Sequence, residues 1–234
     1  MPQTAIVIYR ESDGKVPLIE WFDSIPNKAQ DKCIARIEIL QEKWHELRRP
    51  ICDYLDRGIY ELRSRYENIH YRVLYAFAGR NIMLLSHGCT KIKEVPKREI
   101  KRAVSNLRNY EKDPKNSHLL RRAVIMAKKK KTTSNAVKIL HKRYIRGKNK
   151  RIESLERERE NLNIAEQIYR LRTQAGLSQK QLAKFVGTTQ SVISRLEDAD
   201  YNGYSLAMLR KIGAALHQRI EVEFVPESAS YAFG

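Results

Sequence analysis

Cysteine is scarce in this chain: there are three among 234 residues, Cys33, Cys52 and Cys89, and none lies at Cys-x-x-Cys spacing. This pattern favours neither a zinc site nor a disulfide framework. No apolar run approaches the roughly 18 residues that a membrane span needs, and the first residues, MPQTAIVIYR, do not follow a secretory signal pattern. We therefore expect a reduced, cytoplasmic protein without membrane contacts.

Negative charge is also scarce, because 45 Lys and Arg stand against 27 Asp and Glu, for a formal net charge of +18. The excess is uneven: residues 126–160 contribute +9 and residues 161–234 only +1. A strong positive excess favours a polyanionic partner, which on charge alone could be DNA or RNA. The length and the 42% hydrophobic content predict about two domains.

The first 118 residues alternate between strand and helix patterns. Strands are expected where β-branched and aromatic residues gather between turn residues, and helices where apolar residues recur three or four apart. The expected strands are 4–10, 58–66, 69–78 and 81–86, and the expected helices are 17–25, 27–47 and 96–112. This order predicts an α+β domain over residues 1–118, with a small antiparallel sheet that carries its helices on one face.

From residue 126 the composition changes abruptly to MAKKKKTTSN, which is typical of a solvated, flexible stretch. We assign 119–160 to a basic linker and a helical extension, and 161–234 to an all-α unit. Within these segments, helices are expected at 136–145, 151–162, 164–175 and 205–216. The last apolar stretch, 219–225, alternates as a short strand that could pair with its copy in a second subunit and so make a homodimer.

Residues 177–197, LSQKQLAKFVGTTQSVISRLE, predict two short helices joined by a tight turn. Ser178 is a natural N-cap for the first helix, and Gly187 can end it because glycine tolerates positive φ. Thr188 or Thr189 can cap the second helix, which exposes short polar side chains suited to base edges in a major groove. The pattern resembles the helix-turn-helix of the Cro/C1 (XRE) repressor family; the alternative is an ordinary helical hairpin.

The exposed polar side chains of this unit are candidates for contacts with operator DNA. Gln190 and Ser191 are expected at base edges, and Gln179 at a phosphate or a base. Arg195 is expected to hold either a phosphate or a local carboxylate such as Asp198. The residues expected to position the DNA backbone are Thr188, Thr189 and Ser194. The family binds palindromes as dimers, with half-sites about 34 Å apart or a multiple of that distance.

Strand alternation gathers basic residues on one face of the N-terminal sheet. Arg63 and Arg65 share one face of strand 58–66, and Arg72 lies on the face of the next strand opposite Tyr71. The loop expected after the last strand, SHGCTKIKEVP, carries His87, Lys91 and Lys93. No paired carboxylates or clustered metal ligands accompany these residues, which argues against a metal-dependent nuclease. We therefore expect no metal and no other cofactor.

These residue types fit one kind of chemistry. A metal-free ribonuclease needs a group to deprotonate the 2′-hydroxyl, cations to stabilise the crowded phosphate, and an acid for the leaving oxygen. Arginine and lysine suit the phosphate, and His87 could act as acid or base because the ordinary pKa of histidine lies near neutrality. The alternative is a basic surface that binds nucleic acid or a partner, and spacing alone leaves both alternatives open.

Taken together, GIYELR, YRVLY and SHGCTKIKEVPKREI resemble the phage-derived RelE/HigB-type toxins of toxin–antitoxin modules, and the likeness extends over residues 4–118. The resemblance implies a fold like that of microbial ribonucleases and cleavage of mRNA on the ribosome. The residues it assigns to phosphate binding are Arg63, Arg65 and Arg72, and those it assigns to proton transfer and charge stabilisation are His87, Lys91 and Lys93. Tyr71 is expected in the core rather than as a base-stacking residue.

The part from Met126 onward resembles the cognate HigA-type antitoxin, through AVKILHKRYIRG and the helix-turn-helix sequence. The chain then looks like a toxin joined to its own antitoxin, as a natural fusion, a read-through or two partner chains written as one. We expect a ribonuclease held inactive in cis beside an autorepressing DNA-binding domain. The alternatives are a transcription regulator with an inactive toxin-like domain, or a gyrase poison of the ParE type, which shares the fold.

The way in which the extension neutralises the toxin is constrained by charge. The extension and the N-terminal domain are both strongly basic, so Coulomb repulsion is expected to oppose their docking. Inhibition is then expected to depend on steric blockage and on apolar contacts. The residues expected to make those contacts are Val137, Ile139, Leu140, Tyr144 and Ile145. Alternatively, the basic extension touches nucleic acid and adds affinity to a nearly neutral DNA-reading unit.

Overall fold

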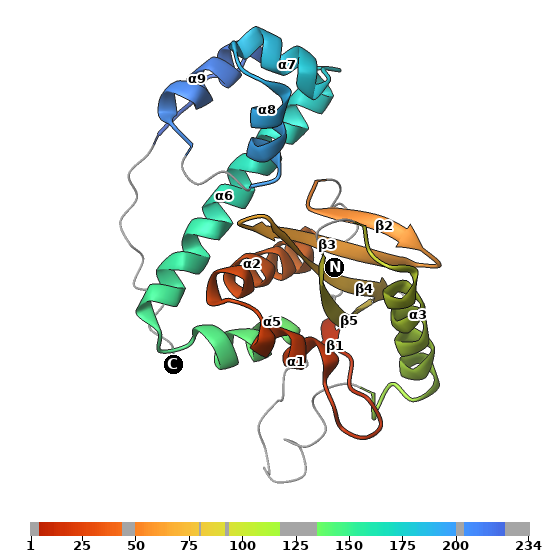
Figure 1. Ribbon diagram of the computed structural model, residues 1–234. Coiled ribbons are helices and arrows are strands. Elements are labelled where there is room, and N and C mark those ends of the chain that lie inside the picture. Colours follow the sequence, from red (N-terminus) through yellow and green to blue (C-terminus); the bar gives the residue numbers. More distant parts are fainter. Residues whose placement is uncertain are drawn as a thin grey trace.

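The computed structural model describes residues 5–43, 50–79, 81–91, 94–117, 135–199 and 204–222. Its N-terminal part is built on a five-stranded sheet in the order β1-β5-β4-β3-β2 (Figure 1). The strands are β1 (Ala5–Ile8), β2 (Cys52–Asp56), β3 (Ile59–Tyr66), β4 (Ile69–Phe77) and β5 (Ile82–Lys91). Neighbouring strands are antiparallel except β1, which runs parallel to β5. The sheet is therefore mixed, whereas the sequence pattern predicts a fully antiparallel sheet.

Helices cover both faces of this sheet. On one face, α1 (Pro17–Ser24) and α2 (Asn27–Lys43) pack against Leu62, and on the other face α3 (Lys97–Lys112) packs against Leu74. Both alternating sets of side chains in β3 and β4 include apolar residues, so both faces must be shielded from water. The prediction of helices on a single face is therefore wrong, whereas the α+β class is confirmed.

Two strands differ from the sequence-based expectation. β2 is not predicted, because its sequence CDYLD carries two aspartates, which strands generally disfavour. β5 continues to Lys91, well beyond the predicted end at Ser86. A register shift against β4 next to Ser86 interrupts the alternation, because Leu74 pairs with His87 and the next residue pairs with Leu85. His87 and Lys91 therefore lie on a strand, and the prediction that they lie in a loop is wrong.

The C-terminal part is helical. Its elements are α5 (Ala136–Leu140), the π-helix η2 (His141–Ile145), α6 (Asn149–Gln174), α7 (Gln179–Val186), α8 (Gln190–Glu197) and α9 (Leu206–Ala215). α6 unites the two helices predicted at 151–162 and 164–175, because no proline or glycine interrupts its sequence. The predicted boundary at 160/161 therefore falls inside a continuous helix. Residues 219–222 show no strand, and 223–225 lie outside the described residues, as does the predicted linker up to 134.

α6 connects two hydrophobic cores. Its first half contributes Leu155 and Leu162 to the large core around α1 and α2, which also contains Leu140 and Ile145. Its second half contributes Ile168 to the smaller core of α7, α8 and α9. Figure 1 shows α6 passing beside α2 and continuing past the sheet to this second group of helices. The helical extension is therefore built into the fold of the N-terminal domain. Among the described helices, none has the length and hydropathy to cross a membrane.

Candidate nucleic-acid sites

A basic cavity of 190 Å³ lies where the β3–β4 hairpin meets α2 and the end of α8, and we call it the arginine cavity. Its lining residues are Arg36, Pro50, Arg63, Ser64, Arg65, His70, Arg72 and Asp198. The strand register explains why the basic residues meet: Arg63 pairs with Arg72, and Arg65 pairs with His70. The arginines predicted for phosphate binding are thus brought together on one face of the sheet.

A buried carboxylate organises two of these arginines. Glu61 is almost fully buried on β3, and its Oε1 accepts a hydrogen bond from Arg63 Nε at 2.7 Å. Its Oε2 lies 2.8 Å from Arg72 Nε, and Asp53 Oδ2 on β2 lies 3.5 Å from an Arg63 guanidinium nitrogen. Buried charges persist where they are paired in this way. Glu61 thus fixes the direction of both guanidinium groups.

His70 is the histidine among the residues that line the arginine cavity. Burial lowers the pKa of its imidazole below the ordinary value, and Arg72, Arg65 and Arg63 lower the pKa further because a second cation beside them is unfavourable. The ring is therefore neutral at pH 7 and can accept a proton. Strand alternation alone could have indicated His70, which is not among the predicted site residues, because it lies two residues before Arg72 and hence on the same face of the strand.

His87 lies elsewhere, under α3. Its ring is 1% exposed, with Nδ1 2.9 Å from the Ser86 hydroxyl and Nε2 3.3 Å from the Glu99 carboxylate. Asn106 donates a hydrogen bond to the same hydroxyl at 2.9 Å. Burial, assisted by the charge of Arg102 and opposed by Glu99, lowers the pKa of His87 to about 4. His87 therefore ties α3 to the sheet and does not line the arginine cavity.

The remaining predicted residues of the N-terminal domain divide into three cases. Lys91 stands opposite His70 in the β4–β5 ladder, so its backbone position adjoins the arginine cavity. Lys93 lies outside the described residues. Tyr71 is 2% exposed in the large core, which confirms the expectation that it is a core residue.

The turn after α8 lines one side of the arginine cavity through Asp198. Arg36 on α2 donates a hydrogen bond to the backbone carbonyl of Asp198 at 2.9 Å, and Lys32 Nζ donates to the carbonyl of Ala199 at 3.4 Å. Burial raises the pKa of the Asp198 carboxyl, against the opposing influence of Arg36. Arg36 and Asp198, which are 162 residues apart in the sequence, thus meet at the cavity that contains the predicted phosphate-binding arginines.

Ion pairs join α6 and its preceding helices to the N-terminal domain. Glu158 is 0% exposed and lies 2.9 Å from Lys32 Nζ and 3.1 Å from Lys28 Nζ. Three further pairs, in which the N-terminal domain supplies the acid, are Arg151–Asp31 at 2.6 Å, Arg159–Glu38 at 2.6 Å and Arg143–Asp23 at 2.7 Å. The expectation that charge only opposes docking is therefore wrong: net charges sum over whole surfaces, whereas these pairs alternate in sign locally.

Apolar side chains complete this contact. Leu140, Tyr144 and Ile145 are buried in the large core, and Val137 and Ile139 pack against it partly exposed. The Tyr144 ring stacks on Phe22 with centroids 5.4 Å apart, and its hydroxyl donates to Asp23 Oδ1 at 2.8 Å. All five residues predicted to contact the toxin domain thus pack against its core.

The helix-turn-helix unit has the local geometry that its sequence predicts. The Ser178 hydroxyl accepts a hydrogen bond from the Gln181 backbone N–H, and the Gln181 side-chain oxygen accepts one from the Ser178 backbone N–H, which makes a capping box. Gly187 ends α7 at φ +73°, in the left-handed region that favours glycine. Thr189 caps α8 by accepting a hydrogen bond from the backbone of Val192.

The predicted DNA-contacting residues fall into two groups. Thr189, Gln190, Ser191 and Arg195 are exposed, whereas Thr188, Ser194 and Gln179 are partly buried. The Gln179 amide donates to Glu197 Oε2 at 2.8 Å, and Glu197 is also held by Arg172 at 2.9 Å. Gln179 therefore stabilises the packing of α7 on α8, and the exposed start of α8 presents Gln190 and Ser191 to solvent.

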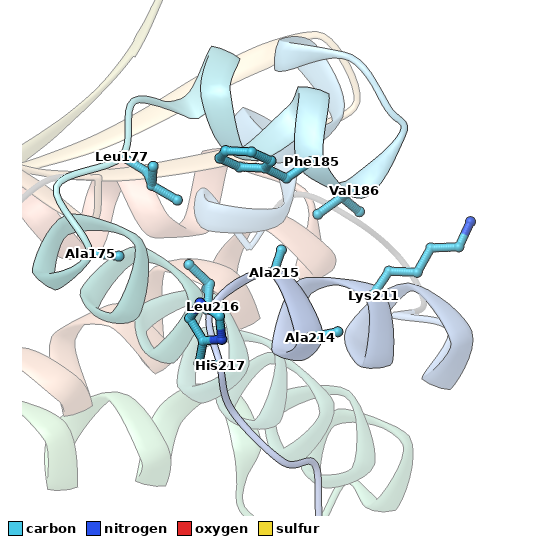
Figure 2. Close-up of a pocket in the computed structure, with 9 residues that line it drawn as sticks. All are labelled: Ala175, Leu177, Phe185, Val186, Lys211, Ala214, Ala215, Leu216 and His217. Carbon is cyan, nitrogen blue, oxygen red and sulfur yellow. The ribbon is translucent and has the colours of Figure 1, made fainter.

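A second pocket, of 750 Å³, lies between the end of α6, α7 and the end of α9 (Figure 2). Figure 2 shows Phe185 and Leu177 along one side of it and Leu216 and His217 along another. Phe185 is 65% exposed, and the lining is mainly apolar. Such a surface suits contact with another protein surface more than it suits chemistry on a phosphate.

Comparison with known protein families separates the same N-terminal and C-terminal parts of the chain. Residues 20–108 match the model of the phage-derived Gp49-like protein family (DUF891), and residues 168–220 match a helix-turn-helix model. No curated protein matches the chain. The Gp49-like match runs from within α1 to within α3 and includes the cavity residues from Arg36 to Arg72, whereas the second match covers α7 to α9 and includes Asp198. The chain therefore joins a Gp49-like domain, of a RelE/HigB-like toxin family, to an XRE-type helix-turn-helix DNA-binding domain.

Proposed function

We propose that this chain is a type II toxin–antitoxin polypeptide that acts in the cytoplasm. Residues 1–118 are a metal-independent endoribonuclease of the RelE/HigB type that cleaves mRNA on the ribosome. The HigA-like remainder, with its extension at 119–160 and its DNA-binding unit at 161–234, neutralises this activity in cis and represses transcription from operator DNA. The observation that carries the proposal is the arginine cavity, lined on one side by the turn that follows the DNA-reading helix.

The arginine cavity suits an RNA phosphate. Arg63, Arg65 and Arg72 offer planar, permanently charged donors that match phosphate oxygens. Glu61 holds two of them in place before any substrate arrives, so little reorganisation is needed when charge develops on the phosphate. Lys91 pairs with His70 in the strand register, and both Lys91 and Lys93 are proposed to add positive charge to this site on the strength of the family resemblance.

Neutralisation in cis follows from what covers the arginine cavity. Residues 198 and 199 accept hydrogen bonds from Arg36 and Lys32, and Asp198 takes up one side of the cavity, where this turn is proposed to obstruct the entry of RNA. The turn is held there by the buried pair of Glu158 with Lys32 and by the apolar contacts of Leu140, Tyr144 and Ile145. We therefore assign the inhibition to both ion pairs and apolar packing.

DNA binding is assigned to the exposed side of α8. Gln190 and Ser191 are proposed to read base edges, and Thr188, Thr189, Ser194 and Arg195 to contact the backbone. A homodimer through the C-terminal unit would match a palindromic operator. The exposed Phe185 and the apolar pocket of Figure 2 are available for such a contact.

The test is to open the arginine cavity in the full chain with Glu158→Lys. This change places a third ammonium group beside Lys28 and Lys32 in a buried site, which drives α6 away from α2. Glu153→Lys, on the exposed side of the same helix, is the matched control. We expect growth arrest and cleaved mRNA on expression of Glu158→Lys alone, with both effects removed by adding Arg72→Ala.

A folded Glu158→Lys chain that leaves growth and mRNA intact would refute the ribonuclease. That result would support the second candidate function, a transcription regulator whose toxin-like domain serves assembly. One observation favours that candidate: α5 and α6 contribute to the core of the N-terminal domain, so both parts fold as one unit. Arrest with DNA damage and intact mRNA would instead indicate a gyrase poison.

A further inference from the structure

A row of basic residues crosses three strands at the mouth of the arginine cavity. In the sheet register, Arg65 of β3 pairs with His70 of β4, and His70 pairs with Lys91 of β5. Arg63 and Arg72 form the next same-face row, two residues along each strand. His70 therefore shares its face of the sheet and the arginine cavity with Arg63, Arg65 and Arg72.

We propose that His70 is the catalytic base of the arginine cavity and takes the proton of the attacking 2′-hydroxyl during RNA cleavage. This inference depends on the ribonuclease activity proposed above. It assigns to His70 the proton transfer that the sequence pattern assigns to His87. The cavity geometry supports the change, because His70 lines the cavity whereas His87 is 1% exposed under α3.

The reaction balances without a cofactor. The imidazole of His70 accepts the 2′-hydroxyl proton, the 2′-oxygen bonds to phosphorus, and the bond from phosphorus to the 5′-oxygen breaks. The leaving 5′-oxygen takes a proton from solvent, and protonated His70 later returns its proton to solvent. The products are a 2′,3′-cyclic phosphate and a 5′-hydroxyl, with no net change in protons.

The charges that face His70 set the protonation state that a base needs. Those on the surrounding elements are Arg63 and Arg65 on β3, Arg72 on β4, Arg36 on α2 and Asp198 after α8. Burial and the three strand arginines keep the pKa of His70 below 6.5, so the ring enters the reaction neutral at pH 7. The negative charge that grows on the phosphate then stabilises the imidazolium as it forms, while the arginines hold the phosphate oxygens.

The experiment uses the full chain carrying Glu158→Lys, with purified RNA or programmed ribosomes as substrate. His70→Ala is added in this background and is compared with Lys115→Ala, which removes an exposed side chain after the end of α3. We expect His70→Ala to lower kcat at least 100-fold, with restoration by added imidazole, and Lys115→Ala to change kcat less than threefold. The rate of the parent should fall at acid pH along a limb centred below pH 6.5, and His70→Ala should lack this limb.

The possible results distinguish the assignment of His70 from the ribonuclease activity itself. If the Glu158→Lys chain cleaves RNA and His70→Ala changes kcat less than threefold, the assignment of His70 is refuted and the ribonuclease stands. If His70→Ala lowers kcat but imidazole restores nothing and the acid limb persists, His70 has a structural role and the assignment is also refuted. If a folded Glu158→Lys chain cleaves no RNA in either form, the ribonuclease and the assignment fail together.

Discussion

Replacement of Glu158 by glutamine measures how strongly the ion pairs between α2 and α6 hold the two parts of the chain together. The Glu158 carboxylate is 0% exposed and lies 2.9 Å from Lys32 Nζ. The Lys32 side chain is itself only 4% exposed, so water cannot replace the lost carboxylate around its ammonium group. Removal of one partner from a buried pair costs about 3–5 kcal/mol. We expect the free energy of unfolding to fall by that amount.

The assay is urea unfolding of the full chain at pH 7, followed by tryptophan fluorescence and by far-UV circular dichroism. Coincident transitions in the two signals are required before a free energy is extracted, because α6 connects two separate hydrophobic cores. Glu153→Gln is the matched control on the same helix. It should change the free energy of unfolding by no more than about 0.5 kcal/mol, because Glu153 is exposed.

A double replacement separates the energy of the Lys32–Glu158 interaction from the effect of changing either position alone. Methionine at both Lys32 and Glu158 removes the two charges together, and we expect it to recover most of the stability lost in Glu158→Gln. A loss below 1 kcal/mol in Glu158→Gln would refute the reasoning, because it would mean that solvent compensates the remaining charge. Strict additivity of the two single replacements would refute the coupling between Glu158 and Lys32.

Three further predictions concern other parts of the chain. His87 is neutral in the fold with its pKa lowered to about 4, so its stabilising contribution is present above pH 6.5 and is lost as pH falls toward 4. The free energy of unfolding should therefore fall by up to about 3 kcal/mol over that interval. His87→Asn should abolish this part of the pH dependence in urea titrations at several pH values. Gly187→Ala forces a side chain into the left-handed region at φ +73°, so it should destabilise the helix-turn-helix by about 1 kcal/mol or more in thermal unfolding. Gln181→Ala removes one half of the capping box and should lower the stability by no more than about 1 kcal/mol. Gln190→Ala should weaken operator binding by about 1–3 kcal/mol and relax the preference at one base pair, measured by titration against single-base operator variants; equal loss on all variants would contradict a base contact.

Sequence patterns predict this structure well where the deciding interactions are between residues close together in the sequence. The capping box at Ser178 and the left-handed Gly187 follow from residue types within one turn of the chain. The faces of β3 and β4 also follow from alternation, which correctly placed Arg63 and Arg72 together and Tyr71 in the core. Each of these features depends on neighbours a few residues away.

The sequence pattern misleads where a single inserted residue or a distant partner decides the outcome. The register shift next to Ser86 ends the apparent alternation of β5, and His87 was therefore expected in a loop near the arginines. Arg36 and Asp198 meet across 162 residues of sequence, and only the packing of α6 on α2 brings them together. Net charge also proved a poor guide, because the buried carboxylate of Glu158 faces two lysines within a surface that is basic on average.

The position of α8 links the two proposed activities. Its first residue, Gln190, is exposed for DNA, and the residue after its last turn, Asp198, lines one side of the arginine cavity. An eight-residue helix is only about 12 Å long and moves as a rigid body. If operator DNA binds the orientation of α8 seen here more tightly than other orientations, it stabilises the closed cavity, and opening the cavity must weaken operator binding by the same factor. Operator affinity of the Glu158→Lys chain, compared with Glu153→Lys, measures that factor directly, and equal affinities would show that the two ends of α8 act independently.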